Sequence, residues 1–494
     1  MPFLVRAMPD IERVIAAGGE ARDLEWNAMF RRRLAPIPSE FFVEPTFGYL
    51  SEQPALDGSA KTIRAALDRL LDSGGPAIVW AHNLAIARNL PLARELVRAC
   101  ATRGVTLIMH HHDWWFDNRW LRWSEMKRAG FRSVGDVART IFPATPNVRF
   151  AAINRADTRL LQGHFGERAH WLPNPTVRVA LPSKQRVRAA RNWLARHLGE
   201  DAPVWLMPCR ILRRKNIAEA LLLTRWLRPE AMLITTGGAS SGDEQPYADR
   251  LAAAAHKHRW RLRIGVLPDN QPAQPSIPDL FAASECVLLT SIQEGFGLAS
   301  LEAAAAARPL IARRMPNIAP DLHQFGFCFP QSYREVLVAP DTFDWSAEVR
   351  RQRHMFREWK NTLPRSCRAW AESPSLLQSP EPAPVPFSRL TFTAQLEVLA
   401  LPPAESWKLC AKWNPLPRAW KARAATGRLE TTPWPAAADD LLGGAAYTRR
   451  FMEMIHRTPR TRLSKSEAIA AHAEFIRLKL RSQQLYPLLF SKNS

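Results

Sequence analysis

Short apolar runs alternate with amphipathic segments through the first 345 residues of the chain. In the first part, apolar runs typical of buried strands fall at 77–80, 105–109 and 147–153, and segments with helical spacing of apolar residues fall at 62–71, 89–102 and 157–163. A Pro-rich break follows at 171–175. This alternation predicts a parallel sheet with helices on both of its faces.

The same alternation restarts beyond the break. Strand-like runs fall at 204–207, 232–235, 261–266, 285–290 and 310–312, and helical segments fall at 217–227, 244–258, 279–284 and 298–307. We therefore predict a second parallel α/β domain. In open sheets of this class, ligands bind beside the carboxyl ends of the strands.

The two ends of the chain follow this pattern less clearly. Near the N-terminus, residues 12–17 and 20–30 have helical character, and Gly18 and Gly19 are typical of a helix end and turn. Beyond about residue 345, helical segments at 347–360 and 466–484 flank a stretch rich in proline. The prediction is two Rossmann-like domains, at 1–180 and 181–345, and a mostly helical C-terminal extension at 346–494 with a Pro-rich linker at 373–388.

The composition is that of a globular protein, with 46% hydrophobic and 23% charged residues. Lys and Arg outnumber Asp and Glu by 68 to 46, so the net charge is +22. This charge favours anionic partners, which include nucleic acid, an anionic membrane surface and phosphorylated substrates. The six cysteines include no C-x-x-C pair, which argues against a zinc or redox motif and fits a reducing cytoplasm. No apolar run is long enough to span a membrane.

The most informative stretch is 290–314, where a strand, a loop with two glycines and a helix follow one another. Glu294 lies in the loop, and Glu302 lies one turn into the helix. The backbone N–H groups at a helix start attract anions, and the two carboxylates suit sugar hydroxyls. The alternative is a tight turn before a helix that carries an ordinary surface glutamate.

Arg210 and Lys215 follow the strand at 204–207 and lead into the helix at 217–227. Arginine can grip phosphate oxygens with two parallel hydrogen bonds, and lysine adds a compact charge. The alternative is a solvated basic turn. Arg213 and Arg214 lie in the same turn and are interpreted as surface residues.

The spacing Glu294-x7-Glu302, together with Arg210 and Lys215 upstream, resembles the signature of retaining GT-B glycosyltransferases, especially family 4. The resemblance covers about residues 77–345 and is most specific over 204–312. It implies an α/β fold in which two Rossmann-like parallel-sheet domains face each other across a cleft. The first domain lies on the acceptor side, and the second binds a nucleoside-diphosphate sugar as co-substrate. The resemblance implies no cofactor and no essential metal.

The resemblance also assigns roles to the matched residues of the second domain. Glu302 is expected to hold the ribose of the nucleotide, and Glu294 to contact hydroxyls of the donor sugar. Arg210 and Lys215 are expected to neutralise the leaving diphosphate, which is a large electrostatic task in such a reaction.

The loop between the two glutamates is expected to bind the donor through its backbone. It consists of Gly295, Phe296, Gly297 and Leu298. The resemblance implies that Gly297 and Leu298 donate N–H groups to the pyrophosphate.

Two strand ends of the first domain add further candidates. His112 and Asp113 follow the strand at 105–109, and the resemblance places such a histidine opposite the transferred sugar. His82 and Asn83 follow the strand at 77–80 and are candidates for the acceptor side. The alternatives are a strand-end histidine that bonds to the backbone and an ordinary loop turn. No metal site is predicted, because His110 and His112 suggest no further ligands.

We therefore predict a retaining glycosyltransferase that moves a hexose from a nucleoside-diphosphate sugar to a hydroxyl of a glycan, a lipid or a small molecule. It is expected in the cytoplasm, where peripheral contact with the anionic inner face of the membrane is open to it. The alternative is a basic non-enzymatic protein that binds nucleic acid or an anionic membrane surface. Nucleic acid is disfavoured, because no helix-turn-helix, zinc-finger or ribonucleoprotein signature is present. A glycoside hydrolase is disfavoured as well, because it would not need the Arg210 and Lys215 pair.

Overall fold

The computed structural model of the chain describes residues 2–8, 10–52, 59–72, 75, 77–267, 274–379, 381–460 and 463–490. The chain forms two compact units. Unit 1 comprises residues 1–177, 362–369 and 439–479, and unit 2 comprises residues 178–361, 370–438 and 480–494. Among the described helices, none combines the length and the apolar composition that crossing a bilayer requires.

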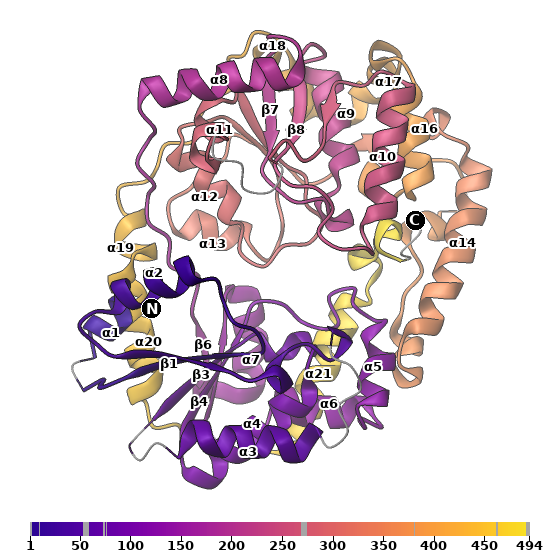
Figure 1. Ribbon diagram of the computed structural model, residues 1–494. Helices are drawn as coiled ribbons and strands as arrows, with labels where there is room; N and C mark the ends of the chain where they lie inside the picture. The colour runs from indigo at the N-terminus through magenta and orange to yellow at the C-terminus, as the bar shows by residue number, and fades with distance from the viewer. Residues whose placement is uncertain are drawn as a thin grey trace. The chain divides into compact units, whose positions relative to one another are not determined.

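Unit 1 is built on a four-stranded sheet in the order β3-β4-β5-β6, with every neighbouring pair parallel (Figure 1). Its strands are β3 (Ile78–His82), β4 (Thr106–His111), β5 (Val148–Ala152) and β6 (Ala169–Trp171). A separate parallel pair consists of β1 (Val14–Gly18) and β2 (Ser39–Val43). The helices of this unit are α1 (Pro2–Arg6), α2 (Leu24–Leu34), α3 (Ser59–Leu71), α4 (Leu90–Arg103), α5 (Arg122–Arg128), α6 (Val134–Ile141), α7 (Arg155–Phe165), α19 (Ala438–Leu442, whose first residue belongs to unit 2), α20 (Gly444–His456) and α21 (Lys465–Lys479).

The last helices of unit 1 come from the C-terminal part of the chain. Figure 1 shows α20, drawn in gold, and α21, drawn in yellow, among the elements of the first 177 residues, where α21 packs against α6 and α7. Phe451 of α20 packs with Ile108 of β4 and Leu4 of α1 in one apolar cluster. Phe475 of α21 lies with its ring centroid 4.7 Å from that of Trp114. Residues 439–479, which the sequence pattern placed in an extension, therefore complete the core of unit 1.

Unit 2 contains a six-stranded sheet in the order β12-β11-β10-β7-β8-β9, with all five neighbouring pairs parallel. Its strands are β7 (Val204–Met207), β8 (Met232–Thr235), β9 (Leu262–Arg263), β10 (Cys286–Leu289), β11 (Leu310–Arg313) and β12 (Gln331–Tyr333). A short antiparallel pair consists of β13 (Leu337–Val338) and β14 (Val385–Pro386). The helices are α8 (Lys184–Leu198), α9 (Ile217–Leu227), α10 (Gln245–Lys257), α11 (Ile277–Ala283), α12 (Leu298–Ala305), α13 (Ala319–Gln324), α14 (Trp345–Thr362), α15 (Ser375–Gln378), α16 (Phe392–Ala400), α17 (Pro403–Cys410) and α18 (Pro415–Ala425).

The sheet of unit 2 is buried on both faces. Along β7, Trp205 and Met207 belong to one apolar cluster, and Val204 and Leu206 belong to another. Successive side chains of a strand point to opposite faces, so each face of this sheet has its own core. This explains why the strand reads as a continuous apolar run, as strands of parallel sheets do. The prediction of a parallel α/β fold with two Rossmann-like sheets is confirmed, while the predicted cleft between the domains stays a prediction.

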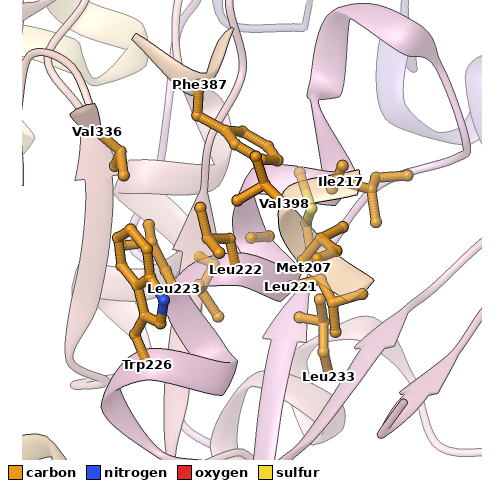
Figure 2. Close-up of a cluster of buried hydrophobic side chains, with 14 of the residues drawn as sticks. Met207, Ile217, Leu221, Leu222, Leu223, Trp226, Leu233, Val336, Phe387 and Val398 are labelled. Atoms are coloured by element: carbon orange, nitrogen blue, oxygen red, sulfur yellow. The ribbon is translucent and has the colours of Figure 1, made fainter. Parts of the chain in front are cut away.

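The Pro-rich stretch 373–388 packs into this core, although the sequence pattern predicted an extended linker. Leu376, Val385 and Phe387 are buried, with exposed fractions of 2%, 7% and 0%. Figure 2 shows the Phe387 ring close to Val398 of α16 and above the side chains of α9. The stretch contains the short helix α15 and the strand β14, and its buried apolar residues join the same cluster as the side chains of α9. Residue 380 of this stretch lies outside the described residues.

The N-terminal region also differs from the sequence pattern. Residues 12–17 were predicted to be helical, but Val14–Gly18 forms β1 and pairs in parallel with β2. Gly19 then comes so close to Gly48 that a Cβ at Gly19 would lie 2.3 Å from the Gly48 Cα. Only glycine fits this approach. Gly18 therefore ends β1 and Gly19 begins the loop after it, so the predicted helix end is wrong.

The packing of Phe387 can be tested by substitution. We expect Phe387→Ala to lower the free energy of unfolding by about 3–5 kcal/mol, because a fully buried ring leaves a cavity behind. Glu381→Ala, at an exposed position of the same stretch, should change it by less than about 0.5 kcal/mol. Urea unfolding of both variants measures the difference. Equal stability of the two would contradict the packed arrangement.

Candidate functional site

Two loops meet at the carboxyl edge of the sheet in unit 2. One follows β7 and carries Lys215, and the other follows β10, the neighbour of β7 in the sheet. The hydroxyl of Thr290 donates to the carbonyl oxygens of Lys215 and Asn216, each at 3.0 Å. The backbone N–H of Ile292 donates to the Arg214 carbonyl at 2.9 Å. These bonds fix the two loops to each other.

The carboxylate of Glu294 is the centre of this junction. It forms an ion pair with the Lys215 ammonium, and its Oε2 lies 3.1 Å from Nη1 of Arg214. The Ser291 hydroxyl donates to Oε1 at 2.9 Å. Burial favours the protonated carboxyl, but Lys215 and Arg214 outweigh it and hold the pKa of Glu294 below its usual value. Glu294 is therefore an ionised carboxylate with both oxygens bonded.

Asn216 and Glu219 hold the start of α9 beside Lys215. The buried Asn216 adopts a left-handed conformation with φ of 52°, and its amide donates to Glu219 at 2.9 Å. Glu219 is fully buried, forms an ion pair with Arg313 and accepts a hydrogen bond of 2.5 Å from the hydroxyl of Tyr333. Because Arg313 ends β11, this network ties the backbone next to Lys215 to a strand across the sheet.

The start of α12 is open to an anion. Gly297 has a φ of +89°, and no side chain caps the helix at this residue. A Cβ at Gly297 would lie 3.1 Å from Cγ2 of Ile318, so both conformation and space favour glycine. The side-chain amide of Asn317 donates to the backbone carbonyl of Glu294 at 2.8 Å and holds the loop in place.

The remaining donor-loop candidates surround this helix start. Phe296 is buried with 5% exposed, whereas Leu298 is 44% exposed and Glu302 is exposed on α12. Gly295 connects Glu294 to Phe296. Phe296 thus anchors the loop, while Leu298 and Glu302 stand where a ligand at the helix start could reach them.

Arg210 lies apart from the Glu294 cluster. Its side chain is exposed, and no hydrogen bond or ion pair joins it to another residue in the part of the chain that the structure describes. It packs against the loop after β8, where a Cβ at Gly237 would lie 2.7 Å from Cγ of Arg210. The backbone N–H of Ile211 donates to the Gly238 carbonyl at 2.8 Å, which fixes this arrangement.

In unit 1, the candidates gather where β3 and β4 end. His82 pairs with His110 in the strand register, and His112 follows two residues after His110. The Asn83 side-chain oxygen accepts from the backbone N–H groups of His112 and Asp113 at 3.1 and 2.9 Å. The two predicted pairs, His82-Asn83 and His112-Asp113, therefore lie together.

These histidines are uncharged near neutral pH. Burial lowers the pKa of His112, and it lowers the pKa of His82 to about 4 even though that residue has an exposed edge. The mutual repulsion of the charged rings acts in the same direction for His82. Asp113 lies 3.6 Å from the Arg119 guanidinium and forms an ion pair with it.

Sequence reasoning missed three contacts of Glu294. Arg214 was interpreted as a surface residue, and Ser291 and Asn317 were not singled out. The position of Ser291 three residues before an acidic side chain is a signal for a local hydrogen bond within a turn. Asn317 lies 23 residues beyond Glu294, so only the folded arrangement reveals it. Arg213, also interpreted as a surface residue, is in fact paired with Glu244 at 3.2 Å.

Comparison with known proteins finds a match within unit 2. Residues 193–332 match the family model of Glycosyl transferases group 1. Mannosylglucosyl-3-phosphoglycerate synthase of Petrotoga mobilis is 27% identical over 254 residues, which cover 49% of this chain and 47% of the relative. The chain thus spans about half the length of this curated relative.

Solved structures of similar proteins include HepE from Anabaena in complex with UDP. It has 15% sequence identity and a TM-score of 0.48, and the match covers 92% of this chain and 95% of that chain. A glycosyltransferase from Rickettsia africae has 9% identity and a TM-score of 0.45, with 89% of each chain covered.

The electrostatics of Glu294 lead to a pH-dependent stability. Its pKa in the folded chain is below the value of about 4.3 for an unfolded glutamate. The ionised form therefore stabilises the fold above that value, and the contribution is lost as the pH falls through the lowered pKa. We expect the stability of the wild-type chain relative to Glu294→Gln to be constant from pH 7 to about pH 5 and to decrease as the pH falls further.

Glu302 provides a control of opposite sign. The Glu302 side chain is exposed, but the chain around it removes part of its hydration, and this partial desolvation raises the pKa of its carboxyl. Ionisation of Glu302 therefore weakly opposes folding, and its contribution decreases as the pH rises. The stability of the wild-type chain relative to Glu302→Gln should therefore increase towards low pH. Urea unfolding at several pH values measures both differences. Parallel pH profiles for the two variants would show that Lys215 and Arg214 do not hold Glu294 ionised.

Proposed function

We propose that this chain, which resembles the group 1 glycosyltransferases over residues 193–332, moves a sugar from a nucleoside-diphosphate sugar to a hydroxyl of an acceptor. The observation that carries this proposal is the junction of Lys215, Arg214 and Glu294 at the carboxyl edge of the sheet. It lies in the loop that leads to the uncapped start of α12. Open parallel sheets bind ligands at this edge.

The charges of this region suit a diphosphate. Lys215 and Arg214 together exceed the single carboxylate of Glu294, and Arg210 adds a cation that makes no ion pair in the described part of the chain. The N–H groups at the start of α12 add partial positive charge. A nucleoside diphosphate would neutralise this excess, and the excess would stabilise the charge that develops on the leaving group.

The bonding of Glu294 favours an electrostatic role. Its Oε1 contacts Lys215 and Ser291, and its Oε2 contacts Arg214. A carboxylate held in this way is a weak nucleophile, but it can accept from hydroxyls of the donor sugar and stabilise positive charge at the anomeric carbon. We infer that the acceptor oxygen attacks that carbon on the side of the departing diphosphate. The bond from the carbon to the diphosphate breaks as the new bond forms with retained configuration, and the proton of the acceptor hydroxyl passes to the departing diphosphate oxygen.

The finer features of the reaction are part of the proposal. We infer that the sugar is a hexose, as expected for a family 4 enzyme, and that Glu302, exposed on α12, accepts from the ribose hydroxyls. Gly295, Phe296, Gly297 and Leu298 line the donor. No cofactor is needed, because Lys215 and Arg210 supply the positive charge. The acceptor is a glycan, a lipid or a small molecule, and the net charge of +22 would suit an acceptor at an anionic membrane surface in the cytoplasm.

In unit 1, we propose that His112 faces the transferred sugar and that His82, Asn83 and Asp113 line the acceptor side. The side-chain oxygen of Asn83 accepts hydrogen bonds from the backbone N–H groups of residues 112 and 113. These bonds support the assignment, because they hold the ends of the two strands next to each other.

Donor binding tests the proposal directly. We expect at least one of UDP-, GDP- and ADP-sugars to raise the melting temperature of the full chain, because a ligand that binds only the folded state stabilises it. Gly237→Ala should weaken that binding roughly tenfold, since its Cβ would collide with Arg210 and displace a phosphate contact.

Gly238→Ala is the matched control, because its Cβ would meet nothing within 4 Å. Its donor affinity should equal that of the wild type. If no nucleotide sugar shifts the melting temperature and the chain instead binds DNA or anionic vesicles with steep salt dependence, it is a basic binding protein and the proposal is wrong.

Turnover tests the role of Lys215. We expect Lys215→Ala to lower kcat/KM by roughly 10²-fold or more, which corresponds to about 3 kcal/mol of lost transition-state stabilisation. Lys257→Ala, at an exposed position of α10, should leave kcat/KM unchanged. Release of the nucleoside diphosphate in the presence of a mixed acceptor pool measures both. A loss below threefold in Lys215→Ala would place this residue outside the reaction.

A further inference from the structure

Three histidines of unit 1 meet on one face of its sheet. His82 is the parallel-strand partner of His110, and His112 lies two residues further along, so all three side chains point to the same face. The ring centroids of His110 and His112 are 4.4 Å apart, and those of His82 and His112 are 5.6 Å apart. The intervening His111 points to the opposite face, where it packs against Trp114.

One nitrogen of His110 is buried without a partner. Its Nε2 lies 2.9 Å from the carbonyl oxygen of Leu172, and since a carbonyl can only accept, Nε2 carries the proton. In the neutral ring, Nδ1 then carries the lone pair. This Nδ1 has no hydrogen-bond partner among the described residues, although His110 is only 1% exposed. A buried acceptor of this kind is costly unless something occupies it.

The bond from His110 to Leu172 is also the usual support of a metal-bound histidine. Such histidines donate their second ring N–H to a backbone carbonyl or a carboxylate, which fixes the tautomer and the orientation of the ring. His110 meets this requirement through the Leu172 carbonyl.

The spacing of the nitrogens fits a metal ion better than a hydrogen bond. Nδ1 of His82 and Nε2 of His112 are 3.4 Å apart, which is long for a hydrogen bond. Two nitrogens at about 2.1 Å from a tetrahedral zinc ion are separated by about 3.4 Å. One ring nitrogen from each of the three histidines lies within 4.8 Å of the others. A modest rotation of the rings would bring all three nitrogens within bonding distance of one metal ion. Burial keeps the pKa of each ring low, which leaves the neutral, metal-binding form at pH 7.

We propose that His82, His110 and His112 bind a divalent transition metal ion, with Zn²⁺ as the ion best matched to three imidazoles. Imidazole nitrogens select zinc and its neighbours over Mg²⁺ and Ca²⁺, which prefer oxygen ligands. Three histidines leave the fourth coordination position of a tetrahedral zinc ion empty. Because His82 is exposed, this position would face solvent, as in zinc sites that accept water or an anionic ligand.

Sequence reasoning dismissed a metal site because it considered only the two histidines of one strand. The third ligand comes from β3, and only the strand register reveals it. The site does not depend on the proposed glycosyl transfer, because the residues assigned to the diphosphate lie in unit 2 and need no metal. Zinc in this position would bind the ring nitrogens of His82 and His112, which the proposed function places beside the acceptor and the transferred sugar.

Metal binding by the full chain tests the site. After treatment with a chelator, we expect the wild type to bind one equivalent of Zn²⁺ in calorimetry and one of Co²⁺ with the visible absorption of a four-coordinate ion. His82→Gln and His112→Gln should each weaken Zn²⁺ binding by at least about tenfold and abolish the Co²⁺ bands. Both positions reach solvent, and melting temperatures in the absence of metal verify that the variants fold.

His256→Gln is the matched control, because it removes an exposed histidine of α10 in unit 2. It should bind Zn²⁺ as the wild type does. The proposal is overturned if the wild type binds no Zn²⁺ at about 100 μM, a concentration well above the dissociation constants of ordinary protein zinc sites. It is equally overturned if binding is unchanged in His82→Gln and His112→Gln, since the metal then sits elsewhere.

Discussion

The common direction of the strands is the constraint on which both candidate sites depend. In a parallel sheet every strand delivers its next residue to the same edge, so residues distant in sequence become neighbours without any long loop. In unit 2 this brings Lys215, after β7, to Glu294, after β10. In unit 1 it brings His82, the last residue of β3, to His112, which follows β4. The chemistry differs between the units, but the geometric origin is the same.

The ion pair in unit 2 also depends on what lies beneath it. A lysine and an arginine next to one carboxylate repel each other. The backbone must therefore hold both side chains in place. Ile292 and Thr290 fix the backbone before and after Lys215. The buried Asn216 bonds to Glu219, which connects this backbone to Arg313. Buried ionic networks of this kind are costly to assemble and hold their groups in one arrangement once formed. The positive region at the start of α12 is thereby prepared before any ligand arrives, which is how electrostatic stabilisation becomes effective.

The sequence was most informative where local pattern and tertiary environment agree. The strand at 204–207 and the helix at 217–227 coincide with β7 and α9, because a strand buried on both faces is a short apolar run bounded by polar turns. Local pattern misled for Val14–Gly18, whose alanines suit a helix and whose pairing with β2 decides the outcome. Local pattern also could not assign α20 and α21 to unit 1. An amphipathic face shows that a helix packs against something, but it does not show which element it packs against. The resemblance assigned Glu294 and Lys215 to one donor site, while their direct contact, the position of Arg214 and the register of the histidines required the folded backbone.

The placement of α20 and α21 has a consequence for how the chain is made. The ribosome completes residues 1–177 long before it reaches residues 439–479, and the whole of unit 2 up to residue 438 is synthesised in between. Until then, the sheet surface around Ile108 and the ring of Trp114 lack the side chains of Phe451 and Phe475 that cover them. A nascent unit 1 therefore presents apolar surface that attracts chaperones or other nascent chains. Unit 1 therefore begins to be synthesised before unit 2, yet its core can be completed only after residues 439–479 have been made.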